Sequence, residues 1–262
     1  MSTFESRAVT SHGVNDVSGY SDFKFIQGFS LVSFQQQDEY HFESKDEETG
    51  LLILDGVCDI TIDGTTYGDL GVRKDVFSGI PTGIYIPSDS AFSIKSSKAT
   101  LAMCKSKCTT KTEPAVIRPE DVKQISAGKD NWSRDVRVII GPDSPSVNMI
   151  LGETLNPPGN WSGIPPAKHE HNNLPEESLH EELYYFKTDK PQGWGIERLY
   201  SPDRNVNELM YLRDNSVTFI PWGYHEIVSA PGYTLYYLFF LSGEGKTLAQ
   251  FEDPEHNWIK NI

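Results

Sequence analysis

Three histidines and one glutamate stand where they could bind one metal ion together. The segment PPAKHEHNNLPEESLHEELYYF contains His169 and His171, and Glu182 directly precedes its β-prone run LYYF. The segment VTFIPWGYHE supplies His225 after a Pro-x-Gly turn. Residues two apart on a strand point the same way, so His169 and His171 can face one ion. Imidazole and carboxylate ligands with an open position suit zinc, manganese or ferrous iron, and the spacing therefore predicts a catalytic metal centre.

The elements that must hold these ligands have the composition of short β-strands. From residue 23 onward, Val, Ile, Thr and aromatic residues alternate with polar ones, and Asp-Gly pairs at 55–56 and 63–64 are typical of turns. The apolar run YTLYYLFFLSG suits a strand buried on both faces. The pattern predicts an all-β protein made of antiparallel barrels or sandwiches.

The chain divides at the one stretch with helical character. Residues 115–133 read VIRPEDVKQISAGKDNWSR, in which a short helix is expected to begin near Pro119. We interpret this stretch as the connection between a first unit, residues 23–114, and a second unit, residues 134–262. Residues 1–22 are polar and Ser-rich, and we expect them to form a loosely held arm.

Two segments indicate an internal duplication. GIYIPSDSAF in the first unit matches VTFIPWGYHE in the second, with Pro87 on Pro221. In this register Ala91 takes the place of His225. If the chain repeats one barrel unit, only the second copy keeps the means to hold a metal ion.

Composition excludes several classes of partner. The net charge of −14 argues against binding to nucleic acid or to anionic membranes, and no run of about 18 apolar residues is present that could span a bilayer. The N-terminus shows no basic segment followed by an apolar one, as a secretory signal would. With three cysteines, Cys58, Cys104 and Cys108, reduced structural thiols in a cytoplasmic protein are expected.

These motifs resemble a known family of metal enzymes. HxH, a glutamate at a strand start and a Pro-x-Gly turn before histidine are similar to the metal site of cupins. PPAKHEHNNLPEES, EELYYF, PQGWGIERLYSPDR, FIPWGYHEIVSAPGYTLYYL and FEDPEHNWI resemble the 5-deoxy-glucuronate isomerases of myo-inositol catabolism. The resemblance covers most of the chain and implies a tandem cupin, or bicupin, of two β-barrel (jelly-roll) units with a degenerate first cupin and a short helical connection.

The chain departs from the family pattern at one position. The family's PPHKHD would place Ala167 on its first histidine and His169 on its second. Either the loop shifts by two residues and restores the pair as His169 and His171, or His169, Glu182 and His225 bind with help from His171 or water. Glu176 and Glu177 compete with Glu182 for the carboxylate role.

The resemblance implies an aldose–ketose isomerisation of 5-deoxy-D-glucuronate to 5-dehydro-2-deoxy-D-gluconate. A divalent metal, zinc or manganese with iron as a third option, would polarise the substrate, and a base would move the proton. A hydride shift is the alternative route. The implied partner is a small sugar acid, and exposed sheet edges in bicupins suggest a homo-oligomer.

Further residues are candidates for binding and proton transfer. For the substrate carboxylate we expect Lys168, beside the metal histidines, and Arg198, with Arg204 behind them, although each would equally fit a surface ion pair. For proton transfer the candidates are Glu197, Tyr184 and Tyr200, which the pattern leaves unresolved.

Other functions are compatible with the same residues. A related uronate ketol-isomerase would use the same metal ligands, and a cupin dioxygenase would use them with ferrous iron and oxygen. A non-catalytic cupin that binds sugar acids would hold a structural metal or none. No Gly-rich phosphate loop and no G-x-S-x-G turn is present, which disfavours nucleotide-binding and serine-hydrolase functions.

Overall fold

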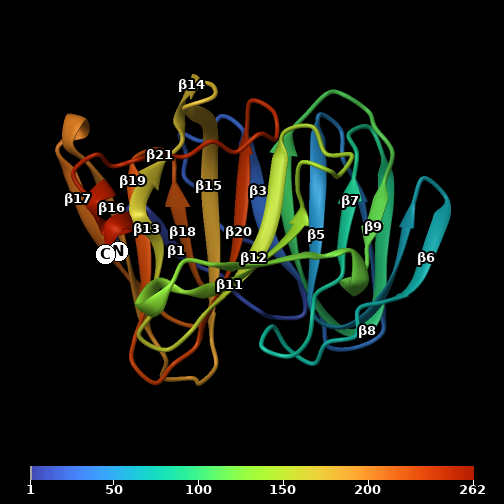
Figure 1. Ribbon diagram of the computed structural model, residues 1–262. Coiled ribbons are helices and arrows are strands. Elements are labelled where there is room, and N and C mark those ends of the chain that lie inside the picture. The colour runs from blue at the N-terminus through green and yellow to red at the C-terminus, as the bar shows by residue number, and fades with distance from the viewer. Residues whose placement is uncertain (1) are drawn as a thin grey trace.

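The computed structural model describes residues 2–262, and almost all of its regular structure is β-strand. The strands form three antiparallel sheets, two of eight strands and one of five. Figure 1 shows the first half of the chain on the right and the second half on the left. The all-β class predicted from the sequence is confirmed.

One sheet belongs to the first half of the chain and is called the N-terminal sheet. Its order is β2-β3-β8-β5-β7-β9, with β4 paired to β8 and β6 paired to β5. Its strands are β2 (Gly13–Asp16), β3 (Ile26–Phe34), β4 (Asp38–Glu43), β5 (Glu47–Ile62), β6 (Thr65–Leu70), β7 (Gly83–Ile86), β8 (Ala91–Lys107) and β9 (Ala115–Ile117).

Two sheets, the central sheet and the outer sheet, form the second barrel. The central sheet has the order β1-β18-β15-β20-β12-β11-β10, with β14 paired to β15, and the outer sheet has the order β17-β16-β19-β13-β21. The central strands are β1 (Glu5–Arg7), β10 (Lys123–Ala127), β11 (Arg134–Ile140), β12 (Met149–Asn156), β14 (Glu170–Asn173), β15 (Glu177–Thr188), β18 (Ser216–Ile220) and β20 (Leu235–Gly243). The outer strands are β13 (Trp161–Lys168), β16 (Gly195–Ser201), β17 (Val206–Leu212), β19 (Tyr224–Ser229) and β21 (Phe251–Glu252).

Helical structure is limited to short 3-10 turns. Among the described residues these are η1 (Pro119–Asp121), η2 (Asp130–Trp132), η3 (Pro202–Arg204) and η4 (Asn257–Asn261). The helix expected near Pro119 is therefore a single 3-10 turn, followed by strand β10. The described residues contain no helix with the length and apolar character that crossing a membrane requires.

The Asp-Gly pairs have different structural roles. Residues 63–64 both have positive φ, 45° and 83°, and connect β5 to β6 as a tight hairpin, as predicted. The prediction of a turn at 55–56 was wrong. Gly56 has φ 81° beside a register shift within β5, where a glycine accommodates a bulge and the strand continues.

Alternation along β15 separates two hydrophobic cores. Leu183 and Tyr185 face the first half, where they join one core with Leu52 and Tyr85. Tyr184, one residue along, faces the interior of the second barrel and joins a separate core. A third core fills the first barrel. The run of β20, buried on both faces, is explained by the same position between two cores.

The two halves are related by the duplication that the sequence suggested. When Pro87 is placed on Pro221, Ile86 falls on Ile220. Ile86 pairs with Thr49, and Ile220 pairs with Glu182. A threonine therefore stands in the first half where the second half has Glu182. Ser106 and Ser242 occupy matching places on β8 and β20, and their hydroxyl groups lie 2.7 Å apart at the junction of the halves.

Two buried glutamates join the halves reciprocally. Glu181 of the second barrel accepts hydrogen bonds from the backbone N–H groups of residues 24, 25 and 26, at 2.7, 2.8 and 3.0 Å. Glu48 of the first barrel accepts them from Val147 and Asn148, at 2.8 and 2.7 Å. Each carboxylate therefore satisfies backbone donors of the other half.

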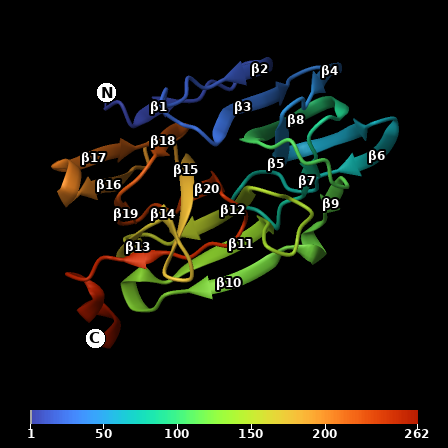
Figure 2. The ribbon, with the colours of Figure 1, turned by 90° about the horizontal axis from the view of Figure 1, so that it is seen from above.

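The N-terminal segment is ordered by strand pairing, contrary to expectation. β1 pairs with β18 of the second barrel, and β2 pairs with β3 of the first. Figure 2 shows β1 beside β18. The side chain of Phe4 is buried against Tyr20 and Trp222, which fixes the segment to the second barrel.

Candidate metal centre

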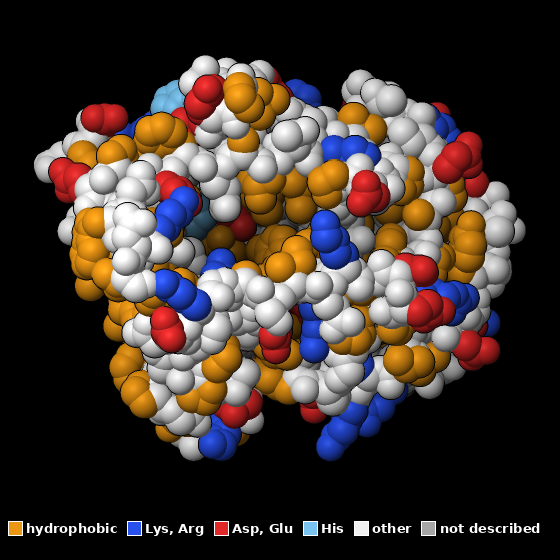
Figure 3. Space-filling view, viewed as in Figure 1, with side chains coloured by type: hydrophobic (Ala, Val, Ile, Leu, Met, Phe, Trp, Pro, Cys, Tyr) orange, Lys and Arg blue, Asp and Glu red, His pale blue; other side chains and the backbone are white. Residues whose placement is uncertain are grey.

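A cavity of about 300 Å³ opens inside the second barrel, between the central and outer sheets. Figure 3 shows the hollow on this face, with histidine and acidic side chains beside a hydrophobic floor. Its polar wall includes Arg134, Thr154, Ser162, Tyr184, Tyr237 and Gln250. The apolar wall includes Ile164, Phe239 and Leu241. A cavity of this size and mixed lining is typical of a small-molecule site.

Three of the predicted ligands meet at this cavity. His169 directly follows β13, Glu182 lies on β15 and His225 lies on β19, and each side chain comes from a different strand. The Nε2 atoms of His169 and His225 lie 3.0 and 3.2 Å from the same Glu182 oxygen, Oε2. Their exposed fractions are only 3%, 4% and 6% in chain order. The three groups form a compact, buried donor set.

The backbone orients both imidazole rings toward Glu182. His169 Nδ1 donates to the carbonyl oxygen of His180 at 2.9 Å, and His225 Nδ1 donates to that of Gly223 at 3.1 Å. Hydrogen bonds of this kind leave Nε2 as the ligand atom and hold the ring in place. Two imidazoles and one carboxylate fit zinc or ferrous iron, with positions left open for substrate.

Mutual contacts set the protonation of this group. Burial raises the pKa of Glu182, but hydrogen bonds from His169 and His225 outweigh it and hold the pKa well below its usual range. Burial lowers the pKa of His169, but its hydrogen bond to Glu182 outweighs this and raises it. Glu182 is therefore ionised, as a ligand to a cation must be.

His171 lies outside the cavity. Its side chain is 59% exposed, and Nδ1 lies 3.3 Å from Glu177 Oε1. His171, Glu177 and Glu170 form a second group of possible ligands outside the cavity, in which only His171 is exposed. The chain leaves β13 at His169 and enters β14 at Glu170, and β14 pairs with β15, so His169 and His171 do not face one ion.

Ala167 faces the position that a fourth ligand would occupy. It pairs with His225 across β13 and β19 and lines the cavity. Since residues two apart share a face, His169 and Ala167 lie on the same side of the chain. The methyl group leaves this side of the centre without a side-chain donor.

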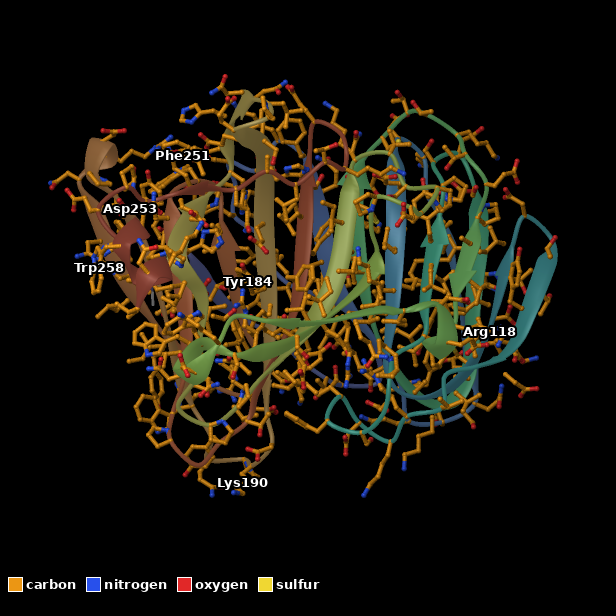
Figure 4. All side chains as sticks on the ribbon, in the orientation of Figure 1. Arg118, Tyr184, Lys190, Phe251, Asp253 and Trp258 are labelled. Atoms are coloured by element: carbon orange, nitrogen blue, oxygen red, sulfur yellow. The ribbon has the colours of Figure 1, made fainter. Side chains whose placement is uncertain are left out.

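The three candidates for proton transfer lie in three different environments. Tyr184 lines the cavity, and Figure 4 shows it among the strands of the second barrel. Burial raises its pKa well above its ordinary value. Glu197 is 0% exposed and lies near Tyr184 and Thr218 in the barrel interior, away from the cavity surface. Tyr200 donates a short hydrogen bond to Asp253 on the opposite face of the outer sheet. Of the three, Tyr184 can touch a molecule in the cavity.

The three cations expected to bind the substrate do not line this cavity. Lys168 and Arg204 form ion pairs with Glu170, at 2.6 and 2.7 Å, and Arg198 pairs with Glu226 at 3.1 Å. Lys168 lies between Ala167 and His169, so strand alternation turns it away from the metal ligands. Each of the three cations therefore forms an ion pair within the protein, which was the alternative to substrate binding.

Arg134 is the cavity residue that sequence reasoning missed. It begins β11 and lines the cavity together with Glu182 and His225. It precedes the metal histidines by more than thirty positions in the sequence, and no motif marks it. Only the pairing of β11 with β12, and of β12 with β20, brings it to this wall.

The chain is similar over nearly its whole length to a family of bacterial enzymes. A model of the KduI/IolB family matches residues 5–259. A 5-deoxy-glucuronate isomerase of Bacillus velezensis is 35% identical over 256 residues, which cover 95% of this chain and 94% of the relative. The enzyme of the same name from Bacillus subtilis is 34% identical and covers 91% of this chain and 89% of the relative.

Solved structures share the fold. An IolB-like protein of Salmonella typhimurium superposes with a TM-score of 0.93 at 23% identity, covering 98% of this chain and 99% of the other. An oxalate decarboxylase of Lactobacillus farciminis gives 0.69 at 10% identity, covering 100% and 91%. A Bacillus subtilis oxalate decarboxylase with Mn(II) centres gives 0.64 at 11% identity, covering 96% and 80%. These likenesses confirm the predicted tandem cupin fold.

Proposed function

This chain belongs to the KduI/IolB family, and from that premise we propose that it is a metal-dependent 5-deoxy-glucuronate isomerase. The assignment to a site rests on the grouping of His169, Glu182 and His225, of which Glu182 and His225 line a cavity inside the second barrel. The reaction is the conversion of 5-deoxy-glucuronate to 5-dehydro-2-deoxy-gluconate, a step of myo-inositol catabolism.

The donor set supports a divalent metal ion as the cofactor. His169, Glu182 and His225 would hold one divalent ion, for which zinc, manganese and ferrous iron are the candidates. When bound, such an ion supplies a Lewis acid for the aldehyde and for the neighbouring hydroxyl group of the substrate. The methyl group of Ala167 leaves room beside His225 for those oxygen atoms.

Side chains at the cavity can donate a hydrogen bond to the substrate and exclude water from it. In this reaction a proton leaves the carbon that bears the hydroxyl group and returns to the former aldehyde carbon. The Tyr184 hydroxyl stays protonated because burial raises its pKa, so it donates a hydrogen bond to a substrate oxygen on which charge develops. Phe239 and Leu241 exclude water from the same wall. Glu197 is buried near Tyr184 and does not line the cavity, so it is not assigned a contact with the substrate.

The ligand set also favours one alternative. Two histidines and one carboxylate with open positions are the facial triad of non-haem ferrous oxygenases. A cupin dioxygenase would therefore use the same three residues with oxygen as cosubstrate.

An anaerobic assay separates the two functions. Metal-loaded protein is incubated with 5-deoxy-glucuronate in deuterated water without oxygen, and the product is identified by NMR. We expect the ketose to form, with deuterium on the former aldehyde carbon if an enediol carries the reaction. Formation of product only when oxygen is admitted would replace the isomerase with the dioxygenase, and a lack of product under both conditions would reject both.

Three further properties are part of the proposal. We propose that residues 23–114 are a cupin unit without a ligand set and that residues 134–262 are the metal-binding unit. A cytoplasmic location agrees with the three buried, free cysteines. Self-association would use the exposed edge strand β17, where Leu209 and Tyr211 face solvent.

A further inference from the structure

One arginine faces the cavity without a counterion. Arg134 is the only lysine or arginine among the described residues that line it. Within residues 2–262 its side chain makes a single hydrogen bond, from Nη1 to the carbonyl oxygen of Trp132 at 3.3 Å. Its Nε atom is buried and has no partner. A buried donor of a charged group is costly to leave unpaired, so the arrangement calls for an anion.

The other arginines of this region are paired differently. Arg137, three residues along the same strand, lies 2.8 Å from Glu153, and Arg73 lies 2.9 Å from the same carboxylate. Arg198 pairs with Glu226. The chain therefore satisfies these guanidinium groups with its own carboxylates and leaves the one in the cavity without such a partner.

The surroundings hold Arg134 in place. A Cβ atom at Gly128 would lie 2.9 Å from Arg134 Nη1, so the guanidinium rests against the backbone of the β10–β11 connection. Tyr237 lies within electrostatic reach of Arg134, and its hydroxyl lies 2.5 Å from the hydroxyl of Ser162. These neutral hydroxyl groups can complete a site for an anion.

The arginine lies toward the end of the cavity opposite the metal ligands. Glu182 pairs with Leu241, whereas Tyr237 lies four residues earlier on β20. At about 3.3 Å per residue, the backbone positions at these two levels are about 13 Å apart along the strand, and the side chain of Tyr237 lies between them within electrostatic reach of both Arg134 and Glu182. The cavity thus has ligands for a cation at one end and a free cation at the other, which matches a molecule with an aldehyde at one end and a carboxylate at the other.

We propose that Arg134 binds the carboxylate of the sugar acid and selects acids over neutral sugars, an inference that rests on the proposed isomerase function. The planar guanidinium offers parallel N–H donors that match a carboxylate. Tyr237 and Ser162 lie beside the bound group. Arg134 thus sets which end of the substrate reaches the metal ligands.

The test measures binding separately from turnover. The probes are the aldehyde-reduced form of 5-deoxy-glucuronate, which cannot isomerise, and its neutral counterpart with the carboxylate also reduced to an alcohol. Calorimetry compares metal-loaded wild type with Arg134→Met and Arg134→Lys. Because a hydrogen-bonded charge is lost, Arg134→Met is expected to bind the acid about 30-fold more weakly and the neutral probe unchanged. Arg134→Lys should fall between, since it keeps the charge without the fork.

A matched control removes a cation outside the cavity. Arg204→Met leaves Glu170 paired with Lys168, and affinity for the acid is expected to stay within about two-fold of wild type. Metal content and circular dichroism of each variant are measured in parallel to verify folding.

The outcomes separate this inference from the proposed function. If Arg134→Met keeps its affinity for the acid, or loses the acid and the neutral probe equally, the role of Arg134 is overturned. If wild type binds the acid but fails to isomerise 5-deoxy-glucuronate, while Arg134→Met still loses the acid selectively, the proposed function fails and the carboxylate site stands.

Discussion

His225 and His171 differ in what surrounds their imidazole rings. His225 is buried with Nε2 aimed at Glu182, whereas His171 is mostly exposed beside Glu177. Replacing His225 with alanine should empty the centre, because even the loss of a group that only orients a ligand typically costs about 10- to 100-fold in metal affinity. Replacing His171 with alanine should leave the metal content at the wild-type level. Elemental analysis of the purified variants checks both.

The second variant is also the control for the first. Full metal occupancy in His225→Ala would remove His225 from the ligand set. Loss of metal in His171→Ala would mean that the loop rearranges to bring both histidines to the ion.

Glu197 should make stability depend on pH. Burial, with smaller effects of nearby Glu182 and Glu226, raises its pKa from 4.5 to about 8. The folded state then binds this proton more tightly than the unfolded state, so the contribution is full below pH 4.5 and is lost as pH rises to about 8. Glutamine at this position cannot ionise, so Glu197→Gln removes this loss. The free energy of unfolding of the variant, relative to that of wild type, should therefore rise by at least about 1 kcal/mol between pH 5 and pH 8.

Urea unfolding at several pH values measures this difference. Other groups titrate alike in both proteins and cancel in the comparison. If the curves of unfolding free energy against pH run parallel for wild type and Glu197→Gln, the pKa of Glu197 is not raised and the side chain is ionised in the folded state.

Residue types and spacing predicted part of the centre and missed the rest for a physical reason. The grouping of His169, Glu182 and His225 could be predicted because residues suited to bind a metal are recognisable by type and by position relative to strands and turns. Arg134 was missed because an arginine at a strand start is ordinary, and its lack of a counterion exists only in the folded barrel.

Strand β12 supports the cavity wall through a glycine. A Cβ atom at Gly152 would overlap the ring of Phe239 and lie 2.5 Å from the carbonyl oxygen of Arg137. We expect Gly152→Ala to lower the free energy of unfolding by about 1 to 3 kcal/mol, because the ring must leave its place. Denaturant unfolding measures the change.

Gly28 on β3 provides the matched control. The nearest atom to a Cβ there is Lys105 Cδ at 3.7 Å, so alanine fits. Gly28→Ala should be neutral or stabilising by up to about 1 kcal/mol, since it restricts the unfolded chain. Equal destabilisation by both substitutions would mean that backbone conformation, and not the Phe239 contact, sets the effect.

At the scale of elements, strand alternation was a better guide than local helix signals, although it wrongly placed His171 beside His169. It predicted the strands, and it explains why Lys168 turns outward between Ala167 and His169. The proline and acidic residues near Pro119 predicted a helix, but pairing of β10 with β11 took that segment into the central sheet. Tertiary pairing overrode a weak local preference.

The reciprocal carboxylates should bind the molecule into one cooperative unit. Glu181→Ala leaves three backbone donors of the first half without their acceptor, which we expect to cost about 3 kcal/mol and to lower Tm by about 10 °C. Because the halves share a core, unfolding should remain a single transition. Differential scanning calorimetry measures both quantities.

Glu176 in the preceding turn gives the comparison. It is exposed, and Glu176→Ala should leave Tm unchanged. Two resolved transitions in either variant would show that the barrels unfold independently.

The place of β1 in the central sheet bears on how the protein is made. Residues 5–7 are synthesised about 210 residues before their partner, residues 216–218. At a translation rate of about 5 to 20 residues per second, β1 waits on the order of 10 to 40 seconds before β18 is synthesised. Translation therefore delivers the first barrel before the second, and the second is completed only when an early strand docks onto a late one.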